Sequence, residues 1–162
     1  MKRTALVCLS LASLAWGDPP YPMGNVEGYF IPDLIKTHKF TFEPGAFVNC
    51  TENSFATYSY FYCESKDAWV TVDTGSAKVK ATFRTLNVTA VLASATVPAT
   101  LSYDLYGRGK MPLPDGTDFE TDVSLWFQRK MDEPEKVVGR LSFGTGAEGA
   151  IVAKWPEPPT IK

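Results

Sequence analysis

One segment of the chain has the residue types of a catalytic motif. Val72-Asp73-Thr74-Gly75-Ser76 spells the aspartic-protease signature, in which a carboxylate stands at a glycine-containing turn. That reaction needs two such carboxylates sharing one proton, so a single Asp73 could be catalytic only in a homodimer. Val137-Val138-Gly139-Arg140 has the hydrophobic-glycine pattern that packs behind this loop in retroviral-type proteases.

The alternative interpretation of Asp73 is an ordinary hairpin turn. Alternating residues stand on both sides of it, and Asp-Thr-Gly-Ser is favourable turn chemistry. The sequence shows no glycine-rich flap, and Lys78 and Lys80 stand where the protease fold would bury its chain. We therefore expect a protein that is not an enzyme and has no catalytic residue, with a dimeric aspartic protease using Asp73 as the alternative.

Two weaker patterns also have structural explanations. Gly144-Thr145-Gly146-Ala147-Glu148-Gly149 matches a nucleotide-binding spacing, but a strand and prolines follow it, not the helix that would hold phosphates. A flexible turn is expected there. His38 is the only histidine in the sequence, and no cysteine or carboxylate spacing accompanies it. We expect no metal site and no cofactor.

The first residues have the composition of a secretory signal peptide. Lys2 and Arg3 precede a short apolar run, and small residues favour cleavage after Gly17. The run is too short to span a membrane, so we expect a secreted, extracellular protein. Its expected parts are a signal peptide (1–17), an extended proline-rich arm (18–26), a β domain (27–155) and a proline-rich tail (156–162).

Size and charge narrow the class of protein. Removal of 17 of the 162 residues leaves about 145, enough for one domain with a real core. The chain has 16 basic and 18 acidic residues, and the leader contains two of the basic ones. An acidic balance argues against nucleic acid and against an anionic membrane surface as partners, because both require a basic face.

The leader contains Cys8, so the mature chain retains Cys50 and Cys63. On a secretory route this pair is expected to form a disulfide, worth about 3 kcal/mol. A single extended strand would hold the two Cα atoms roughly 40 Å apart, so the chain must reverse between them. Turn residues favour Thr51–Ser54, but a tight turn there would place Cys50 opposite Phe55. We expect an irregular loop or a bent strand, not a clean hairpin.

Short alternating segments separated by turns predict an all-β protein, a single-domain antiparallel β-barrel or β-sandwich. Residues 106–116 are rich in glycine and proline and are expected to be loop. Residues 88–97 are apolar on both sides and are expected to form a buried central strand, although residues 86–95 could alternatively form a helix. The expected strands are 28–35, 37–42, 46–50, 56–63, 69–73, 77–85, 88–97, 101–105, 119–128, 135–143 and 150–155.

Glycosylation sequons stand at Asn87 and Asn49, the latter beside a cysteine, and predict exposed turns. Tyr58, Tyr60 and Tyr62 share one side of a strand. They form either half-buried barrel core or an exposed aromatic surface for a sugar, a small aromatic ligand or a partner. Trp126 stands among polar residues on its strand and is expected to be exposed, which makes these four aromatics the candidate binding surface.

The cysteine-containing stretch resembles the Alternaria major-allergen-like family of small fungal secreted proteins. Aromatics precede the second cysteine in Phe61-Tyr62-Cys63, and a strand, turn and strand follow from Trp69 to Val79. Ala93-Ser94-Ala95-Thr96-Val97-Pro98 is similar to the family's Ala-Thr-Ala-Thr-Leu-Pro, and residues 28–34 are similar to its first strand. The resemblance covers about residues 27–98. The family's second cystine has no counterpart, and the chain is longer after Pro98.

The resemblance implies a secreted antiparallel β-barrel without an established enzymatic mechanism, and it places Asp73 in an ordinary hairpin. Family members include allergens and elicitors that meet host or plant defence proteins. We therefore expect a non-enzymatic effector or allergen-like protein that recognises a host protein, a glycan or a small aromatic ligand, with a homodimer left open. The other alternative is a carrier of a small hydrophobic ligand inside the barrel, lined by Tyr58, Tyr60, Phe83 or Phe127.

Overall fold

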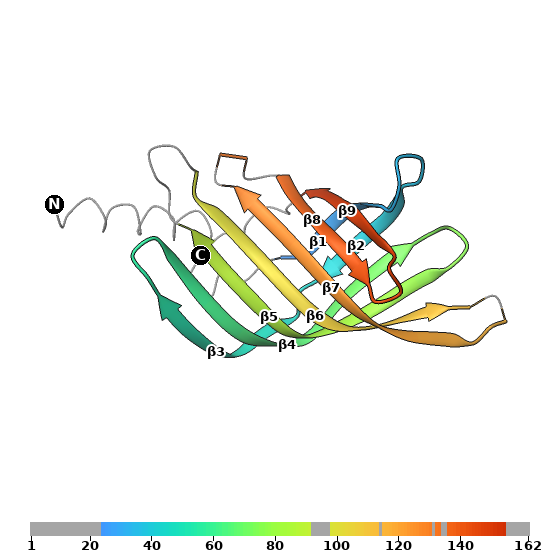
Figure 1. Cartoon of the computed structure of the whole chain (residues 1–162), viewed down its shortest axis with the longest axis horizontal. Helices are drawn as coiled ribbons and strands as arrows, with labels where there is room; N and C mark the ends of the chain where they lie inside the picture. Colours follow the sequence, from blue (N-terminus) through green and yellow to red (C-terminus); the bar gives the residue numbers. More distant parts are fainter. Residues whose placement is uncertain (1–23, 92–97, 114, 131, 134–135, 155–162) are drawn as a thin grey trace.

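The computed structural model describes residues 24–91, 98–113, 115–130, 132–133 and 136–154. Strands dominate these residues, and they contain no helix (Figure 1). The expected signal peptide with Cys8, residues 18–23 of the arm and the proline-rich tail lie outside them. The strands are β1 Val26–Ile31, β2 His38–Glu43, β3 Ala46–Ser54, β4 Tyr58–Asp73, β5 Lys78–Val91, β6 Thr100–Pro112, β7 Asp118–Lys130, β8 Lys136–Phe143 and β9 Glu148–Lys154.

The strands form one antiparallel sheet that closes on itself as an eight-stranded barrel, which confirms the expected fold class. The sheet order is β2-β1-β9-β8-β7-β6-β5-β4-β3, and pairing of β2 with β4 closes the barrel. The long strand β4 has two partners on one side. Residues 59–66 of β4 pair with β3, and Trp69–Asp73 pair with β2. Strand β3 is therefore an additional strand beside the eight that close.

The chain changes direction between β2 and β3 at Pro44-Gly45. Gly45 has a positive φ of 63°, and a Cβ at this position would lie 2.0 Å from the Lys66 carbonyl oxygen. Only glycine combines this backbone conformation with such a close approach to β4. Because of this bend, β2 and β3, which follow one another in the chain, pair with the two halves of β4.

Aromatic rings fill the barrel interior. The ring of Phe42 lies 6.1 Å from that of Phe83 and 5.3 Å from that of Phe127, centroid to centroid. Phe40 packs edge-on against Phe127 at 5.8 Å. Each of these side chains is almost completely buried, which contributes about 1.5–3 kcal/mol per residue. Side chains from β2, β5 and β7 therefore meet inside the barrel.

The four central strands are longer than expected. Residues 78–91 belong to one strand, so the helix alternative for 86–91 is wrong, and residues 92–97 lie outside the described part. The expectation of a loop over residues 106–112 is also wrong, because β6 continues to Pro112. A Cβ at Gly107 would lie 1.8 Å from the Thr82 carbonyl oxygen, next to a β-bulge in β5. Glycine is used here for close approach of two strands, not for a turn.

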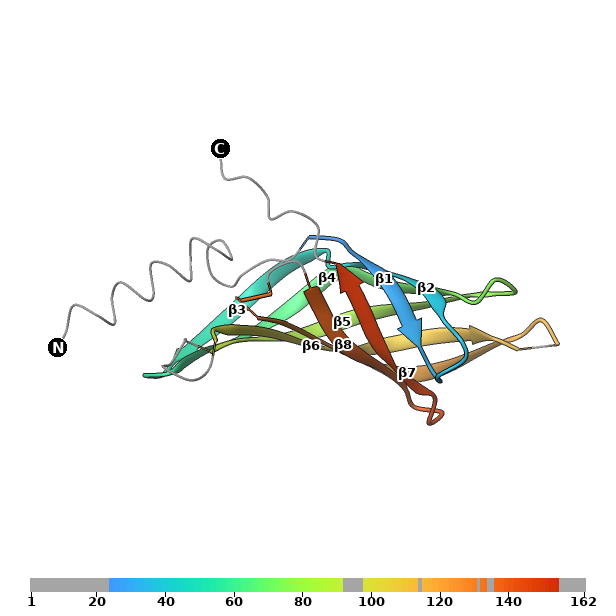
Figure 2. The same cartoon turned by 90° about the horizontal axis from the view of Figure 1, so that it is seen from above.

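Hairpins extend beyond the barrel at both ends. Figures 1 and 2 show the β3–β4 hairpin at one end and the β4–β5 and β6–β7 hairpins at the other. The β3–β4 turn lies at Phe55–Tyr58, where the Phe55 N–H donates to the Tyr58 carbonyl oxygen (2.8 Å) and the two rings stack at 4.6 Å. The turn is thus four residues later than Thr51–Ser54, and the connection is a hairpin whose strand β3 is interrupted by a β-bulge, not the irregular loop that was one of the two expectations.

A β-bulge between Val48 and Thr51 brings the two cysteines together across this hairpin. Thr51 pairs with Tyr62, and Asn49 has a positive φ of 52°. Cys50 is bonded to Cys63 with a Cα–Cα distance of 4.1 Å, as expected from the even pair. Cys63 faces the interior and is fully buried. The disulfide therefore joins the added strand β3 to the barrel.

Replacement of both cysteines by alanine should lower the free energy of unfolding by about 3 kcal/mol. The bond joins residues 13 apart in sequence, and a loop of this size restricts the unfolded chain by that amount. Urea unfolding of the oxidised protein and of Cys50→Ala/Cys63→Ala measures the difference. A thiol assay on the unfolded wild-type protein checks that the bond is formed, and equal midpoints would contradict the prediction.

Candidate functional site

The Asp73 turn has the contacts of a structural hairpin. The Gly75 N–H donates to Asp73 Oδ1 (2.9 Å), and the Thr74 N–H donates to the Ala77 carbonyl oxygen (3.0 Å). Asp73 Oδ2 also lies 3.9 Å from Lys78 Nζ. The carboxylate thus holds its own turn between β4 and β5, which agrees with the hairpin interpretation.

The second half of the protease pattern lies elsewhere in the barrel. Residues 137–140 belong to β8, which pairs with β7 and β9, whereas the Asp73 turn joins β4 to β5. The segment therefore does not pack behind the Asp73 loop as it would in a retroviral-type protease. The contacts around Asp73 are those of a turn, and they give no support to the catalytic alternative.

The remaining patterns also have structural roles. Residues 144–147 form the turn between β8 and β9, where the Phe143 N–H donates to the Ala147 carbonyl oxygen (2.8 Å). This confirms the turn interpretation of the glycine-rich segment. His38 begins β2, and its ring stacks on Phe30 at 6.5 Å. No cluster of potential metal ligands occurs among the described residues.

The two sequons occupy different environments. Asn49 is exposed at the β-bulge, and its Nδ2 donates to Glu64 Oε2 (3.0 Å). Asn87 lies in the middle of β5, not on the exposed turn that its sequon predicted, and it pairs with Tyr62 on β4 and Asp104 on β6. The buried Asn87 Oδ1 accepts no hydrogen bond from the described residues. Glycosylation of Asn49 and Asn87 stays a prediction.

The tyrosine stripe faces outward. Phe61 and Cys63 point into the barrel, so Tyr58, Tyr60 and Tyr62 lie on the opposite side of β4. Tyr58 is 37 % exposed and Tyr62 is 45 % exposed, while Tyr60 is more deeply packed. The stripe therefore forms part of the outer surface and not of the barrel core. Tyr58 belongs to the hairpin tip, and Tyr60 and Tyr62 adjoin the outer faces of β5 and β6.

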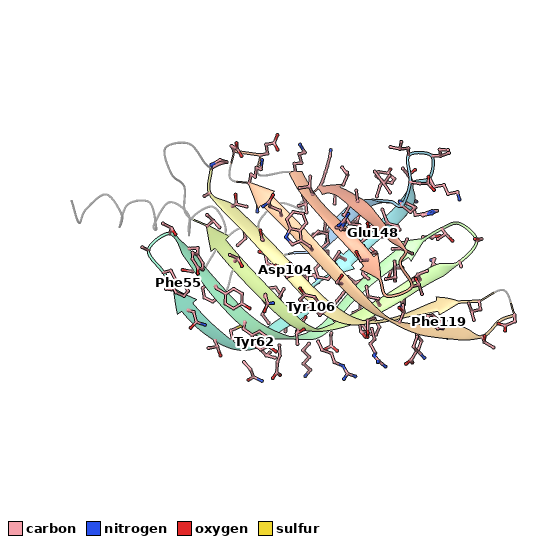
Figure 3. All side chains as sticks on the ribbon, viewed as in Figure 1. Phe55, Tyr62, Asp104, Tyr106, Phe119 and Glu148 are labelled. Carbon is pink, nitrogen blue, oxygen red and sulfur yellow. A yellow bond between two sulfur atoms is a disulfide. The ribbon has the colours of Figure 1, made fainter. Side chains whose placement is uncertain are left out.

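Tyr60 and Tyr62 belong to a larger surface that spans four neighbouring strands. Asn87, Asp104 and Trp126 lie side by side across β5, β6 and β7 in the ladder register. Figure 3 shows Tyr62, Asp104 and Tyr106 on the same side of the sheet, over β4 and β6. We call this surface the polar-aromatic face; it consists of Tyr60, Tyr62, Thr85, Asn87, Thr89, Ser102, Asp104, Tyr106, Ser124, Trp126 and Gln128.

Asp104 is the charged residue in the middle of this face, and the ladders continue to Glu64 beside Thr85 and to Arg140 beside Trp126 at its edges. It is partly buried, and burial raises the pKa of its carboxyl above the usual value. No hydrogen bond or ion pair joins its carboxylate to another described residue. Burial also raises the pKa of Tyr60, and the neighbouring negative charge of Asp104 adds to this effect. The electrostatics of Tyr60 and Asp104 are therefore coupled.

Two adjoining hollows extend the face toward β8. One has a volume of about 100 Å³ and lies beside Asp104 and Trp126, and the other has a volume of about 390 Å³. Both are lined by Tyr106, Ser124 and Ser142, so they meet at these residues. Arg140 lines the smaller hollow and pairs with Glu148 (Nη2 to Oε1, 3.2 Å). Together they form a shallow, open groove along β6, β7 and β8.

A third hollow lies on another side of the barrel. It has a volume of about 670 Å³ and includes the exposed side chains of Tyr29 and Val152, on β1 and β9. Neither residue belongs to the polar-aromatic face. Tyr29 is therefore a useful control position, since it is an exposed tyrosine on an outer face far from β6 in the strand order.

The sequence predicted part of the polar-aromatic face. The candidate binding residues Tyr60, Tyr62 and Trp126 lie on one outer surface, but Trp126, which was expected to be exposed, is only partly so. Asp104, Tyr106 and the role of Asn87 in the middle of the face were missed. The inward alternation of Leu101, Tyr103 and Leu105 already places residues 102, 104 and 106 outward, but the glycines after Tyr106 suggested that the strand had ended.

The sequence patterns also did not predict that a charged residue is buried. Arg129 is 5 % exposed and faces the barrel interior from β7. Burial lowers the pKa of its guanidinium, and nearby Tyr103 acts in the opposite direction. Arg129 lies on the inner side of the strand whose outer side presents Gln128 and Trp126, so it belongs to the core and not to the site.

No protein-family model, curated protein or solved structure matches this chain. The resemblance to the Alternaria family therefore stays a prediction. The described residues include no helix that is long and apolar enough to cross a membrane.

The partial burial of Asp104 predicts a pH dependence of stability. Because its folded-state pKa lies above the unfolded value of about 3.9, ionisation opposes folding, and stability falls as pH rises through the unfolded and then the folded pKa. Asp104→Asn should therefore be more stable than wild type near pH 7 and lose this advantage near pH 3.

Urea unfolding of Asp104→Asn and wild type at these two pH values measures the effect. Asp118→Asn, at an exposed position at the start of β7, serves as the control. A variant that is equally stable or less stable than wild type at neutral pH would show that the Asp104 carboxylate does not carry the expected penalty.

Proposed function

We propose that this protein is a secreted, non-enzymatic recognition protein of effector or allergen type that binds an extracellular target through the polar-aromatic face. The single observation that carries the proposal is the outward orientation of Tyr60, Tyr62, Tyr106 and Trp126 around a partly buried carboxylate. Exposed tyrosine and tryptophan side chains combine large apolar area with a polar group, and they dominate binding energies at protein surfaces. A disulfide-bonded barrel supports the secreted location expected from the leader.

The packed interior supports surface recognition over transport. Phe42, Phe83 and Phe127 contact one another where a carried ligand would lie, and Tyr58 and Tyr60 face outward. The catalytic alternative receives no support from Asp73, whose carboxylate holds its own turn. Peptide cleavage at acid pH that disappears in Asp73→Asn would restore that alternative.

Binding to the extracellular target should depend on the polar-aromatic face. The test compares wild type with the face variant Tyr62→Ala/Trp126→Ala and with the control Tyr29→Ala/Phe119→Ala, whose residues are exposed aromatics outside the face. Each immobilised protein is exposed to extracellular fluid of a host tissue, and the retained material is identified. Wild type and control should retain the same target, and the face variant should lose about tenfold or more of it.

Thermal unfolding of all three proteins checks that the variants are folded. If the face variant retains the target and the control loses it, the recognition surface lies on the other side of the barrel. That result would contradict the proposal.

A further inference from the structure

We infer that the polar-aromatic face is a carbohydrate site that takes a neutral, extended oligosaccharide along the groove over β6, β7 and β8. This inference rests on the proposed function and specifies the chemistry of its target. It follows from the hydrogen-bonding groups of the face, from its rings and from the shape of the hollows.

The hydrogen-bonding groups suit a ligand rich in hydroxyls. Between Glu64 and Arg140 at its edges, the face has Asp104, the donor N–H of Trp126 and otherwise uncharged hydroxyls and amides, which can both donate and accept. The Asp104 carboxylate is partly exposed and accepts no hydrogen bond from the described residues. A ligand hydroxyl can therefore donate to it. Asn87, its partner in the ladder, has a buried Oδ1 that also accepts no hydrogen bond from the described residues, so the amide is free to turn toward a ligand.

The aromatic rings suit the apolar faces of sugar rings. Tyr62 is 45 % exposed and Tyr106 is 52 % exposed, and Trp126 stands beside Asp104 in the register. A pyranose ring has a C–H face that can cover such a ring while its hydroxyls reach the neighbouring polar side chains. Rings and hydrogen-bonding groups alternate over β4, β6 and β7, which is the pairing that a sugar requires.

The shape favours several linked rings over one enclosed sugar. The hollows of about 100 and 390 Å³ are open and continuous at Tyr106, Ser124 and Ser142. An extended chain can therefore follow the groove from the Asp104 side of β6 toward β8. The larger hollow is lined by Asp122, whose charge is paired with Arg108 (Oδ1 to Nε, 3.4 Å), so a neutral ligand leaves this ion pair intact.

The charge pattern favours a neutral ligand over a basic segment of a protein. Asp104 alone would attract a cation, but the guanidinium of Arg140, which also pairs with Glu148, lines the same small hollow as Asp104 and Trp126. A cationic ligand would meet this guanidinium, whereas a hydroxyl group can donate to Asp104 and accept from Arg140. The binding of a neutral sugar should therefore be insensitive to salt.

The sequon at Asn87 adds a further consequence. Asn87 lies in the middle of the face, between Tyr62 and Asp104. A glycan attached to its side chain would occupy the surface that a separate oligosaccharide needs. The form that binds is therefore the one in which Asn87 carries no glycan.

The experiment uses oxidised mature protein from a bacterial periplasm, which adds no N-glycan, and isothermal titration with laminarihexaose, cellohexaose and chitohexaose as neutral probes. At least one probe should bind at concentrations up to ~1 mM. Trp126→Ala should weaken binding about tenfold or more, and Asp104→Asn should also weaken it, while Tyr29→Ala should bind as wild type does. Affinity should be unchanged between ~0.05 and ~0.5 M NaCl.

Three results would overturn the inference. They are the absence of binding to any of the three probes, equal affinity of wild type and Trp126→Ala, and affinity that falls steeply with salt, which would indicate a basic ligand. If no probe binds but Tyr62→Ala/Trp126→Ala still loses its extracellular target, the carbohydrate inference is wrong and the proposed recognition function stands. Protein glycosylated at Asn87 that binds a probe as tightly as the unmodified form would place the sugar elsewhere.

Discussion

Pairing of β2 with β4 is the constraint on which the rest of the structure depends. It converts an open sheet into a closed barrel, so every strand has one side toward the core and one toward the outside. Once Phe40 and Phe42 of β2 enter the interior, Val70 and Val72 of β4 must do so as well. Strict alternation from Val70 and Val72 would turn Tyr60 and Tyr62 inward, but a β-bulge between Glu64 and Ala68 reverses the alternation, so these tyrosines face outward.

The disulfide extends the same constraint into the protruding hairpin. Shifting a strand by one residue would turn all its side chains to the opposite side. The bond from Cys50 to the buried Cys63 holds β3 and β4 in one register, and Tyr62 is the neighbour of Cys63 in sequence. A feature that stabilises the barrel thus also fixes how Tyr60 and Tyr62 are presented beside Asn87 and Asp104.

Local alternation predicted much of the fold, but contacts between strands decided the rest. The strands around Phe83 and Phe127 follow from their alternating residues, and the class of fold follows from the number of strands. Gly107 was assigned to a loop because the need for a close approach to Thr82 is visible only in three dimensions. The tyrosine stripe was ambiguous because Phe61, on its other side, is equally aromatic. Asp104 gave no sequence signal, since its importance comes from neighbours on β5 and β7.

The most direct test of the central claim is hydroxyl-radical footprinting of the secreted protein, with and without its extracellular target, read out by mass spectrometry. In the free protein, Tyr62, Tyr106 and Trp126 should be oxidised, whereas the buried Tyr103 should not. Addition of the target should protect these three residues and leave Tyr29 reactive. Protection of Tyr29 in place of these residues, or labelling of Tyr103 in the free protein, would contradict the account.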